Sequence, residues 1–371
     1  MLTVCHLTSV HGYEDVRILL RECRSLAAAG YATHLVAPGA PDGLVHGVRL
    51  HGVTRRTGRV ARMLRTVGEV YTAAVRVDAD LYHFHDAELI PVGLLLRARG
   101  RKVIYDIHED VPRDLVTRDY LPGAAKPMLQ WLVERIENFA GRRFSGLVPA
   151  TPAIAARFRR LNRPLAVINN YPLLDEWGSL DGMPWTDRPF AVAYVGAVSL
   201  DRGLIQMVQA IGDLREPSQA HLELAGTFAP PEPRTLAARL EGWARVRELG
   251  QLSREDVRRV LGRVRAGLLL YHPAPNNVES QPNKLFEYMA AGLPVIASDF
   301  PLWREIVAGT GCGLLVDPLD SRAIAQAIEY VLTHAADAEA MGRRGRRAFE
   351  ERFNWSMEER RFLDFYSGVL D

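Results

Sequence analysis

The sequence predicts an α/β protein that consists of two doubly wound domains in succession. Apolar runs of strand length alternate with amphipathic helical stretches, and the alternation restarts after a segment rich in Pro, Gly, Asp and Trp at residues 170–189. The chain also has 371 residues, which is more than a single hydrophobic core usually organises. Strands and helices that alternate in this way form parallel sheets with helices on both faces, so each half is predicted to be Rossmann-like.

The predicted strands are the apolar runs of each half. They lie at residues 2–8, 33–38, 80–84, 102–107, 146–150 and 165–170 in the first half, and at 190–196, 221–226, 245–249, 266–271 and 294–298 in the second. A helix that ends at Gly30 is predicted after the first strand. Its apolar face would consist of Val16, Leu19, Leu20, Cys23 and Leu26.

These elements place one domain at residues 1–170 and a second domain at residues 171–354. The segment 355–371 carries aromatic side chains at helical spacing, and we expect it to form a helix that returns to the first domain. Ligands of open α/β sheets bind at the carboxyl ends of the strands, so two such domains predict a ligand cleft between them.

Composition excludes several classes of function. The net charge of +2 is too small to indicate nucleic-acid binding. The cysteines Cys5, Cys23 and Cys312 have no paired spacing, which disfavours a disulfide framework or a zinc site and fits a reducing compartment. We see no basic leader before an apolar run and no stretch of ~20 apolar residues. We therefore expect a cytoplasmic protein.

The most informative segment is ESQPNKLFEYMAAGLPVIASD, at residues 279–299. Proline suits the first turn of a helix, so we expect a helix to begin near Pro282, with Glu287 about one turn inside it. Its first residues would offer backbone N–H groups at the positive end of the helix dipole, beside an ammonium group, which is what a diphosphate requires. The residues concerned are Asn283, Lys284 and Leu285.

The two glutamates of this segment carry the clearest resemblance to a known family. Glu279-x7-Glu287, followed by AAGLPVIASD, resembles the E-x7-E signature of the retaining family-four glycosyltransferases with the GT-B fold. The resemblance implies that Glu287 binds the ribose of a nucleotide-sugar and that Glu279 lies by the transferred sugar. Two glutamates at this spacing alone are usually solvated surface charges, but Lys284 between them and GLPVIASD after them favour the functional interpretation.

A second loop, YVGAVSLDRG at residues 194–203, supports a phosphate site. Gly196 allows a ligand to approach the backbone, and Arg202 can bind phosphate oxygens with two hydrogen bonds. The loop resembles the family's diphosphate loop, but Ala197 stands where many members carry arginine, so the contact would depend on Arg202 and Lys284. A weaker signal places the base near Gly250 and Leu252, without distinguishing a UDP-sugar from a GDP-sugar.

The first domain supplies polar clusters that each follow a predicted strand, so they would meet at one edge of the sheet. His108 resembles the family histidine near the reacting centre, and Gly12 resembles the small residue of the first loop. The cluster residues that we expect on the acceptor side are His11, Gly12, His85, Asp86 and Glu109. Although such clusters and the Asp-x-Asp at residues 78–80 also suggest a metal, the basic phosphate loops favour a metal-independent enzyme without a cofactor.

The resemblance implies that the enzyme transfers a sugar with retention of its anomeric configuration. The acceptor would be a hydroxyl of a glycan, of a lipid-linked molecule or of a small molecule. The basic segment 55–76 has apolar residues at helical spacing, so it either lies on an anionic membrane or packs on the sheet. Two other functions stay open on the same fold, a sugar-nucleotide 2-epimerase and a catalytically silent binding subunit. A nicotinamide-dependent dehydrogenase is disfavoured because no G-x-G-x-x-G follows the first strand.

Overall fold

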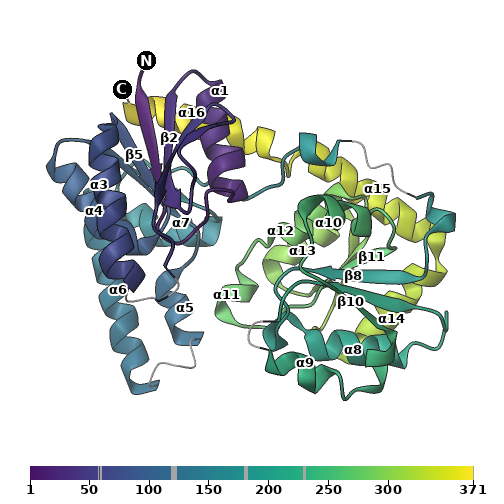
Figure 1. Cartoon of the computed structure of the whole chain (residues 1–371). Coiled ribbons are helices and arrows are strands. Elements are labelled where there is room, and N and C mark those ends of the chain that lie inside the picture. The colour runs from purple at the N-terminus through teal and green to yellow at the C-terminus, as the bar shows by residue number, and fades with distance from the viewer. Residues whose placement is uncertain (57, 59–60, 118–122, 179–182, 229–230, 371) are drawn as a thin grey trace. The chain divides into compact units, whose positions relative to one another are not determined.

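The computed structural model describes residues 1–56, 58, 61–117, 123–178, 183–228 and 231–370, which form two compact units. Unit 1 comprises Met1–Asn170 and the chain from Trp355 onward, and unit 2 comprises Tyr171–Asn354. Figure 1 shows each unit as a sheet with helices packed on it. Both are Rossmann-like, which confirms the predicted fold class.

Unit 1 contains a seven-stranded sheet in the order β3-β4-β2-β1-β5-β6-β7, in which only β3 runs antiparallel to its neighbour. Its strands are β1 Thr3–Leu7, β2 Ala32–Pro38, β3 Gly43–Val45, β4 Val48–Val53, β5 Leu81–Phe84, β6 Lys102–Ile107 and β7 Gly146–Pro149. Its helices are η1 Val16–Cys23, α1 Arg24–Ala28, η2 Arg62–Thr66, α3 Val67–Val77, η3 Ala87–Leu89, α4 Ile90–Ala98, α5 Val111–Thr117, η4 Gly123–Ala125, α6 Lys126–Gly141, α7 Pro152–Phe158, η5 Arg159–Leu161 and α16 Trp355–Leu370.

Unit 2 contains a six-stranded parallel sheet in the order β10-β9-β8-β11-β12-β13. Its strands are β8 Ala191–Val195, β9 His221–Ala225, β10 Val246–Gly250, β11 Ala266–Leu269, β12 Val295–Ser298 and β13 Gly313–Val316. Its helices are η6 Asp175–Trp177, η7 Trp185–Asp187, η8 Leu200–Arg202, α8 Leu204–Asp213, α9 Glu232–Ala237, η9 Glu241–Arg245, α10 Arg254–Leu261, α11 Pro275–Val278, α12 Asn283–Ala290, α13 Pro301–Thr310, α14 Ser321–Thr333 and α15 Ala335–Glu351.

Strand prediction failed in three places. The run 165–170 is not a regular strand, although the N–H groups of Ala166 and Ile168 donate to the carbonyls of Leu147 and Pro149 in β7, both at 3.1 Å. The strand β13 and the hairpin of β3 and β4 were missed. His46 and Gly47 connect this hairpin, and both have positive φ, at 51° and 80°. Two-residue turns with positive φ at both positions commonly join short antiparallel strands. The dipeptide His-Gly between apolar residues was therefore the sequence signal that could have predicted this hairpin.

The first helix differs from the prediction in its winding. Residues Val16–Cys23 form a π-helix, in which each turn holds more residues than in an α-helix, so the buried face departs from the predicted one. Val16 and Leu20 are therefore only partly buried. The side chains buried instead include charged ones, namely Arg17, Arg21 and Glu22. Gly30 does terminate this helical segment with φ 92°, as predicted.

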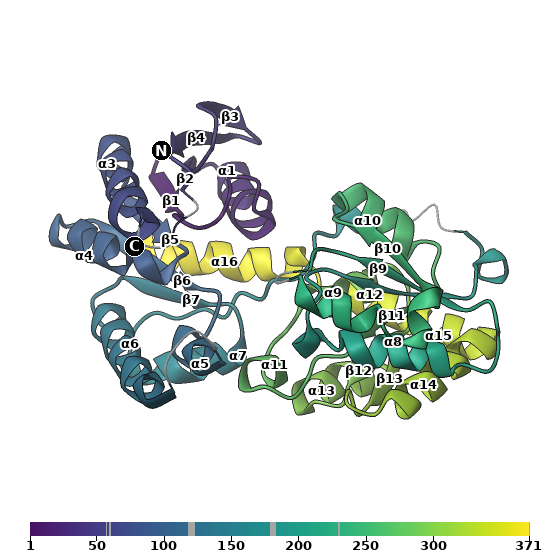
Figure 2. The same ribbon diagram turned by 60° about the horizontal axis from the view of Figure 1, so that its bottom comes forward.

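The last helix, α16, belongs to unit 1, where Figure 2 shows it alongside β5 and β6. The Trp355 indole N–H donates to Ser25 Oγ at 3.0 Å, and the backbone N–H of Asn169 donates to Glu358 Oε2 at 2.9 Å. Within the segment 170–189 that separates the two runs of alternation, the described residues Tyr171, Trp177 and Trp185 are buried in the core of unit 2. None of the described helices has both the length and the apolarity needed to cross a membrane.

Candidate functional site

In unit 2, two basic side chains meet on one buried tyrosine. The Arg202 guanidinium carbon lies 3.8 Å from the centre of the Tyr271 ring, and Lys284 Nζ donates to the Tyr271 hydroxyl at 3.1 Å. Arg202 ends η8 after β8, Tyr271 follows β11, and Lys284 lies in the first turn of α12. The fold therefore gathers both predicted phosphate-binding cations at the carboxyl edge of β8 and β11. Sequence reasoning missed Tyr271, whose only signal was its position at the end of the strand predicted at 266–271.

Gly196 makes room for one of these cations. Its φ is 126°, and a Cβ atom there would lie 2.3 Å from Lys284 Cε and 2.5 Å from Lys284 Nζ. Glycine is thus required at the end of β8 both for the backbone conformation and for the close approach of the lysine side chain. The sequence predicted a close approach by a ligand at this position, and in the structure a neighbouring side chain occupies that space.

Replacing Gly196 with alanine is expected to displace the Lys284 ammonium and to weaken the binding of nucleoside diphosphates. Loss of one charge-assisted hydrogen bond corresponds to a reduction in affinity of roughly tenfold or more. Isothermal titration with UDP and GDP measures this effect. The matched control is Gly309→Ala in α13, where an added Cβ meets no atom within 4 Å. Equal affinities of the two variants would contradict the role of Gly196.

The amino terminus of α12 lies where the sequence predicted it, with Pro282 directly before the first helical residue Asn283. Asn283 and Lys284 are the first two residues of the helix, so their N–H groups have no acceptor in a preceding turn. Leu285 departs from the prediction, because its N–H donates to the Pro282 carbonyl at 3.1 Å and its side chain is buried. The expectation of three free amides was therefore wrong at Leu285.

Glu287 is held by an arginine that the sequence analysis did not single out. Arg254 Nη2 donates to Glu287 Oε1 at 3.4 Å and to Glu176 Oε2 at 2.6 Å. Burial acts to lower the pKa of Arg254, but its hydrogen bond to Glu176 and the charge of Glu287 outweigh burial and raise it. Since Arg254 begins α10, this contact brings the start of α10 next to α12.

The loop expected near the base precedes α10 directly. Gly250 is the last residue of β10 and has φ 66°, and its carbonyl accepts the Gly226 N–H at 2.7 Å. Leu252 is partly buried and packs against the core of unit 2.

Glu279, the first glutamate of the motif, follows α11 and is exposed. The residue after it, Ser280, is held in place because its carbonyl accepts the Trp303 indole N–H at 2.8 Å.

In unit 1, His11 and His108 come together from the loops after β1 and β6, with ring centres 5.7 Å apart. His108 is partly exposed, and its Nε2 lies 2.8 Å from Asp106 Oδ2. His11 Nδ1 lies 3.4 Å from Asp15 Oδ2, and its Nε2 lies 3.4 Å from Asp86 Oδ1. The hydrogen bond to Asp15 and the neighbouring carboxylates raise the pKa of His11, although burial acts against them.

Two of the predicted acceptor residues are buried supports of this site. Asp86 Oδ2 accepts hydrogen bonds from Thr8 Oγ1 at 2.8 Å and from the backbone N–H of Ser9 at 2.7 Å, and so fixes the first loop. His85 is buried between Asp106 Oδ2, at 3.0 Å, and His6 Nδ1, at 2.9 Å. The expectation that His85 faces the acceptor was wrong, because a side chain enclosed in this way reaches no ligand directly.

The other two predicted residues of the first domain remain at the surface. Gly12 is partly exposed, and an added Cβ there would lie 3.3 Å from Arg55 Nη2. Glu109 is exposed beside His108, and its negative charge contributes to the raised pKa of His11.

Beneath the two histidine loops lies a continuous buried network. Arg17 donates to both oxygens of Asp106, with Nε at 3.0 Å from Oδ2 and Nη2 at 2.9 Å from Oδ1. Burial acts to raise the pKa of Asp106, but the positive charge of Arg17, together with His108 and the hydrogen bonds from His108 and His85, outweighs burial and lowers it. From His85 and His6 the chain of contacts continues to Tyr366 of α16, whose hydroxyl lies 2.6 Å from His83 Nδ1.

Because a carboxylate only accepts hydrogen bonds, Asp106 fixes the tautomers along this network. His85 donates through Nδ1 to Asp106 and therefore accepts through Nε2 from His6 Nδ1. His6 Nε2 then accepts the Tyr366 O–H, so His83 Nδ1 donates to the Tyr366 oxygen. All three buried histidines can thus be neutral with these bonds satisfied.

Four side chains of this network have ligand atoms within 4.8 Å of one another, as a metal site requires, namely Glu22, His83, His85 and Asp106. However, Arg17 Nε lies 3.0 Å from Glu22 Oε1 and also donates a hydrogen bond to Asp106. The positive charge of one guanidinium is therefore already paired with both carboxylates. A divalent cation among them would be repelled by this guanidinium. The arrangement favours a network of hydrogen bonds and ion pairs, and metal independence stays a prediction.

Acidification is expected to destabilise unit 1. Burial lowers the pKa of His6, His83 and His85 below the ordinary value, so below about pH 6.5 the unfolded chain binds more protons than the folded one. Their contribution to stability is complete above that pH and is lost as the pH falls. Four other groups of unit 1 act oppositely, since their raised pKa values favour the folded state at low pH; they are Glu22, Glu137, Glu358 and His11. The three histidines are buried side by side in one network, so we expect their effect to prevail and the unfolding midpoint to be lower at about pH 5.5 than at about pH 7.5.

Scanning calorimetry at the two pH values checks this prediction. Unit 2 is the internal control, because its described residues contain no comparable cluster of buried histidines. A midpoint of unit 1 that rises on acidification would contradict it.

Comparisons with known proteins agree with the geometry of both units. Residues 16–170 match the family described as glycosyl transferase 4-like domain, and residues 182–348 match glycosyl transferases group 1. Among proteins with curated functions, none matches the chain significantly.

Solved structures match over the whole chain. The sucrose-phosphate synthase from Thermosynechococcus elongatus has a TM-score of 0.77 at 21% identity, with 100% of this chain and 99% of that chain covered. The Anabaena protein HepE in complex with UDP and glucose has a TM-score of 0.74 at 15% identity, with 99% of this chain and 100% of that chain covered. A UDP-forming trehalose-phosphate synthase from Burkholderia xenovorans has a TM-score of 0.71 at 14% identity, covering 100% of each chain.

Two Rossmann-like units with these neighbours define a protein of the GT-B class. The two family matches together span most of the sequence, and the chain belongs to the family-four type of GT-B glycosyltransferases. It is therefore a glycosyltransferase, as the resemblance of the 279–299 segment implied.

Proposed function

We propose that the protein is a retaining, metal-independent hexosyltransferase that uses a UDP- or GDP-sugar and a hydroxyl acceptor. The observation that carries this proposal is the convergence of Arg202 and Lys284 on Tyr271, next to the amino terminus of α12. Two positioned cations and the positive end of a helix dipole can bind the negative charges of a diphosphate. They would neutralise the charge that a divalent metal ion neutralises in metal-dependent glycosyltransferases. The neighbour HepE, in complex with UDP and glucose, supports a nucleotide-sugar donor.

In this proposal the cations act mainly on the transition state. As the bond between sugar and phosphate breaks, the leaving diphosphate gains negative charge, and preorganised cations stabilise this charge more than the ground state. Glu287 binds the ribose, Glu279 lies by the transferred sugar, and His108 positions reacting groups. The acceptor hydroxyl attacks on the face from which the diphosphate leaves, and its proton passes to that diphosphate. The acceptor is a glycan, a lipid-linked or a small molecule, handled in the cytoplasm or at the inner membrane face.

The proposal is tested by thermal unfolding of the full chain with UDP, GDP and ADP, with and without EDTA. A ligand that binds only the folded state raises the melting temperature by mass action. We expect one base to stabilise the protein, equally in EDTA, and Glu287→Ala to abolish the shift. Glu339→Ala, which changes an exposed glutamate in α15 of the same unit, is the matched control. No shift with any nucleotide at millimolar concentration would overturn the donor site, and a shift that requires a metal would overturn metal independence.

Retention is measured once the donor has been found. The anomeric proton of the new glycoside, observed by NMR, should have the same configuration as the donor sugar. An inverted product would overturn the retaining mechanism while leaving the donor site intact. Conversion of the donor without an acceptor into a 2-epimer would identify the epimerase instead.

A further inference from the structure

Helix α6 of unit 1 turns its apolar side outward. Its exposed large side chains follow helical spacing and include Met128 at 65% and Trp131 at 56% relative exposure. We name this stripe the α6 surface, and it consists of Met128, Trp131, Leu132, Ile136 and Phe139. Soluble proteins rarely expose contiguous apolar patches, and those that exist usually mark an interaction site.

The inner side of the same helix carries a buried carboxylate that is held by ion pairs. Glu137 is fully buried, accepts the Tyr105 hydroxyl at 3.2 Å and pairs with Arg157 at 2.6 Å. Arg157 also pairs with Asp110 at 2.6 Å. A rotation of the helix that buried the apolar stripe would break these buried ion pairs, which is costly. The outward orientation of the α6 surface is therefore fixed by the fold.

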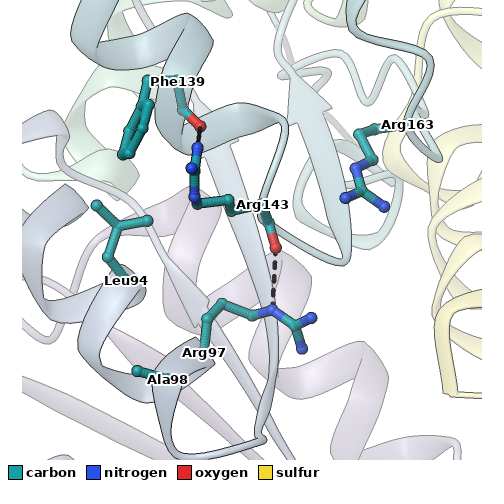
Figure 3. A pocket seen from close by; sticks show the side chains of 6 residues that line it. All are labelled: Leu94, Arg97, Ala98, Phe139, Arg143 and Arg163. Atoms are coloured by element: carbon teal, nitrogen blue, oxygen red, sulfur yellow. Dashed lines mark hydrogen bonds between the residues drawn. The ribbon is translucent and has the colours of Figure 1, made fainter.

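Arginines surround the α6 surface. The Arg143 guanidinium stacks on Phe139 with its carbon 3.5 Å from the ring centre, and Arg135 lies 5.1 Å from the Trp131 ring centre. Figure 3 shows Arg143 with Arg97 and Arg163 around a hollow between α4 and α6 that Leu94 and Phe139 also line.

The hydrogen bonds of these arginines leave their positive charges uncompensated. Arg97 Nε donates to the Arg143 carbonyl at 3.0 Å, and Arg163 Nε donates to the Arg142 carbonyl at 2.6 Å. Arg143 Nη1 donates to the Phe139 carbonyl at 3.0 Å. Within the described part of the chain, no carboxylate forms an ion pair with Arg97, Arg135, Arg142, Arg143 or Arg163. Apolar and aromatic side chains beside unpaired cations are complementary to the surface of an anionic bilayer.

We propose that the α6 surface binds the protein to anionic phospholipid membranes, with its apolar side chains among the acyl chains and its arginines on the headgroups. The segment 55–76 fits this role less well. Val70 and Ala74 are buried on the sheet, and Arg56 and Arg62 are paired with Glu69 and Glu88. Among the described residues of that segment, the exposed large apolar ones are Met63, Leu64 and Val75. Membrane binding is independent of the proposed donor chemistry.

The test is flotation of the full chain with vesicles of phosphatidylcholine, alone or with roughly 30% phosphatidylglycerol, in about 50 mM NaCl. We expect binding to the vesicles that contain phosphatidylglycerol only, reduced roughly tenfold in about 300 mM NaCl. Trp131→Gln with Phe139→Gln, and separately Arg142→Gln with Arg143→Gln, should each lower binding roughly tenfold or more. Because these side chains are exposed, the melting temperature of the variants should equal that of the parent chain. If a double variant melts at a lower temperature, the single variant Trp131→Gln replaces it in the flotation experiment.

The matched control makes the same change on the competing segment. Met63→Gln with Leu64→Gln should bind vesicles like the parent chain. Loss of binding in this control with retention in the Trp131 and Phe139 variant would overturn the assignment to α6. An absence of flotation with phosphatidylglycerol would overturn it as well. A dimer in sedimentation that the Trp131 and Phe139 variant dissociates, without vesicle binding, would make the α6 surface a contact between two copies and overturn the proposal.

Discussion

Replacing Arg17 with methionine is expected to destabilise unit 1 by about 3–5 kcal/mol, because it leaves Asp106 buried without its cation. Arg17 is buried and donates to both oxygens of Asp106 and to the Ile168 carbonyl at 2.9 Å. Methionine has a similar length, so the lost charge dominates over lost volume. Calorimetry of the full chain should show a lower melting temperature for the transition of unit 1 and an unchanged melting temperature for that of unit 2.

The double variant Arg17→Met with Asp106→Asn separates the lost charge from lost packing. An uncharged amide in place of the carboxylate removes the isolated buried charge, so the double variant should recover part of the stability. If the double variant is as unstable as the sum of two independent losses, Arg17 stabilises the fold by packing alone. The single change should also loosen His108, whose Nε2 lies 2.8 Å from the same carboxylate.

Replacing Lys284 with glutamine is expected to weaken the binding of the nucleoside diphosphate by roughly 10- to 100-fold, because one charge-assisted contact of about 1.5–3 kcal/mol is lost. The fold should be unaffected, since Lys284 is only partly buried. Titration calorimetry measures the affinity, and the melting temperature without ligand measures the fold.

Arg343→Gln in α15 is the matched control for this prediction. It removes one positive charge from the same unit, where Arg343 pairs with the exposed Glu339 on its own helix. An equal loss of affinity in both variants would mean that Lys284 acts through the general charge of unit 2, and that Tyr271 does not position it for the diphosphate.

The sequence by itself determined the fold class and the start of the most informative helix. Alternation of apolar runs and amphipathic stretches reports local periodicity, which survives in any environment, so most strands and the two Rossmann-like sheets followed from it. Pro282 likewise marks the beginning of α12 through its own backbone restrictions, and its effect needs no distant partner. Glu279 and Glu287 were predicted as donor-site residues because their spacing with Lys284 resembles a known motif, and their roles stay a prediction.

Only the tertiary structure decided which residues meet. Tyr271 and Arg254 come from segments outside the motif and acquire their roles through contacts with Lys284 and Glu287, which no local pattern contains. The π-helical winding of Val16–Cys23 put Arg17 into the core, and a buried ion pair at Glu137 turned the apolar side of α6 outward. Local sequence specifies periodicity, whereas burial and charge pairing depend on residues that lie far apart along the chain and become neighbours only on folding.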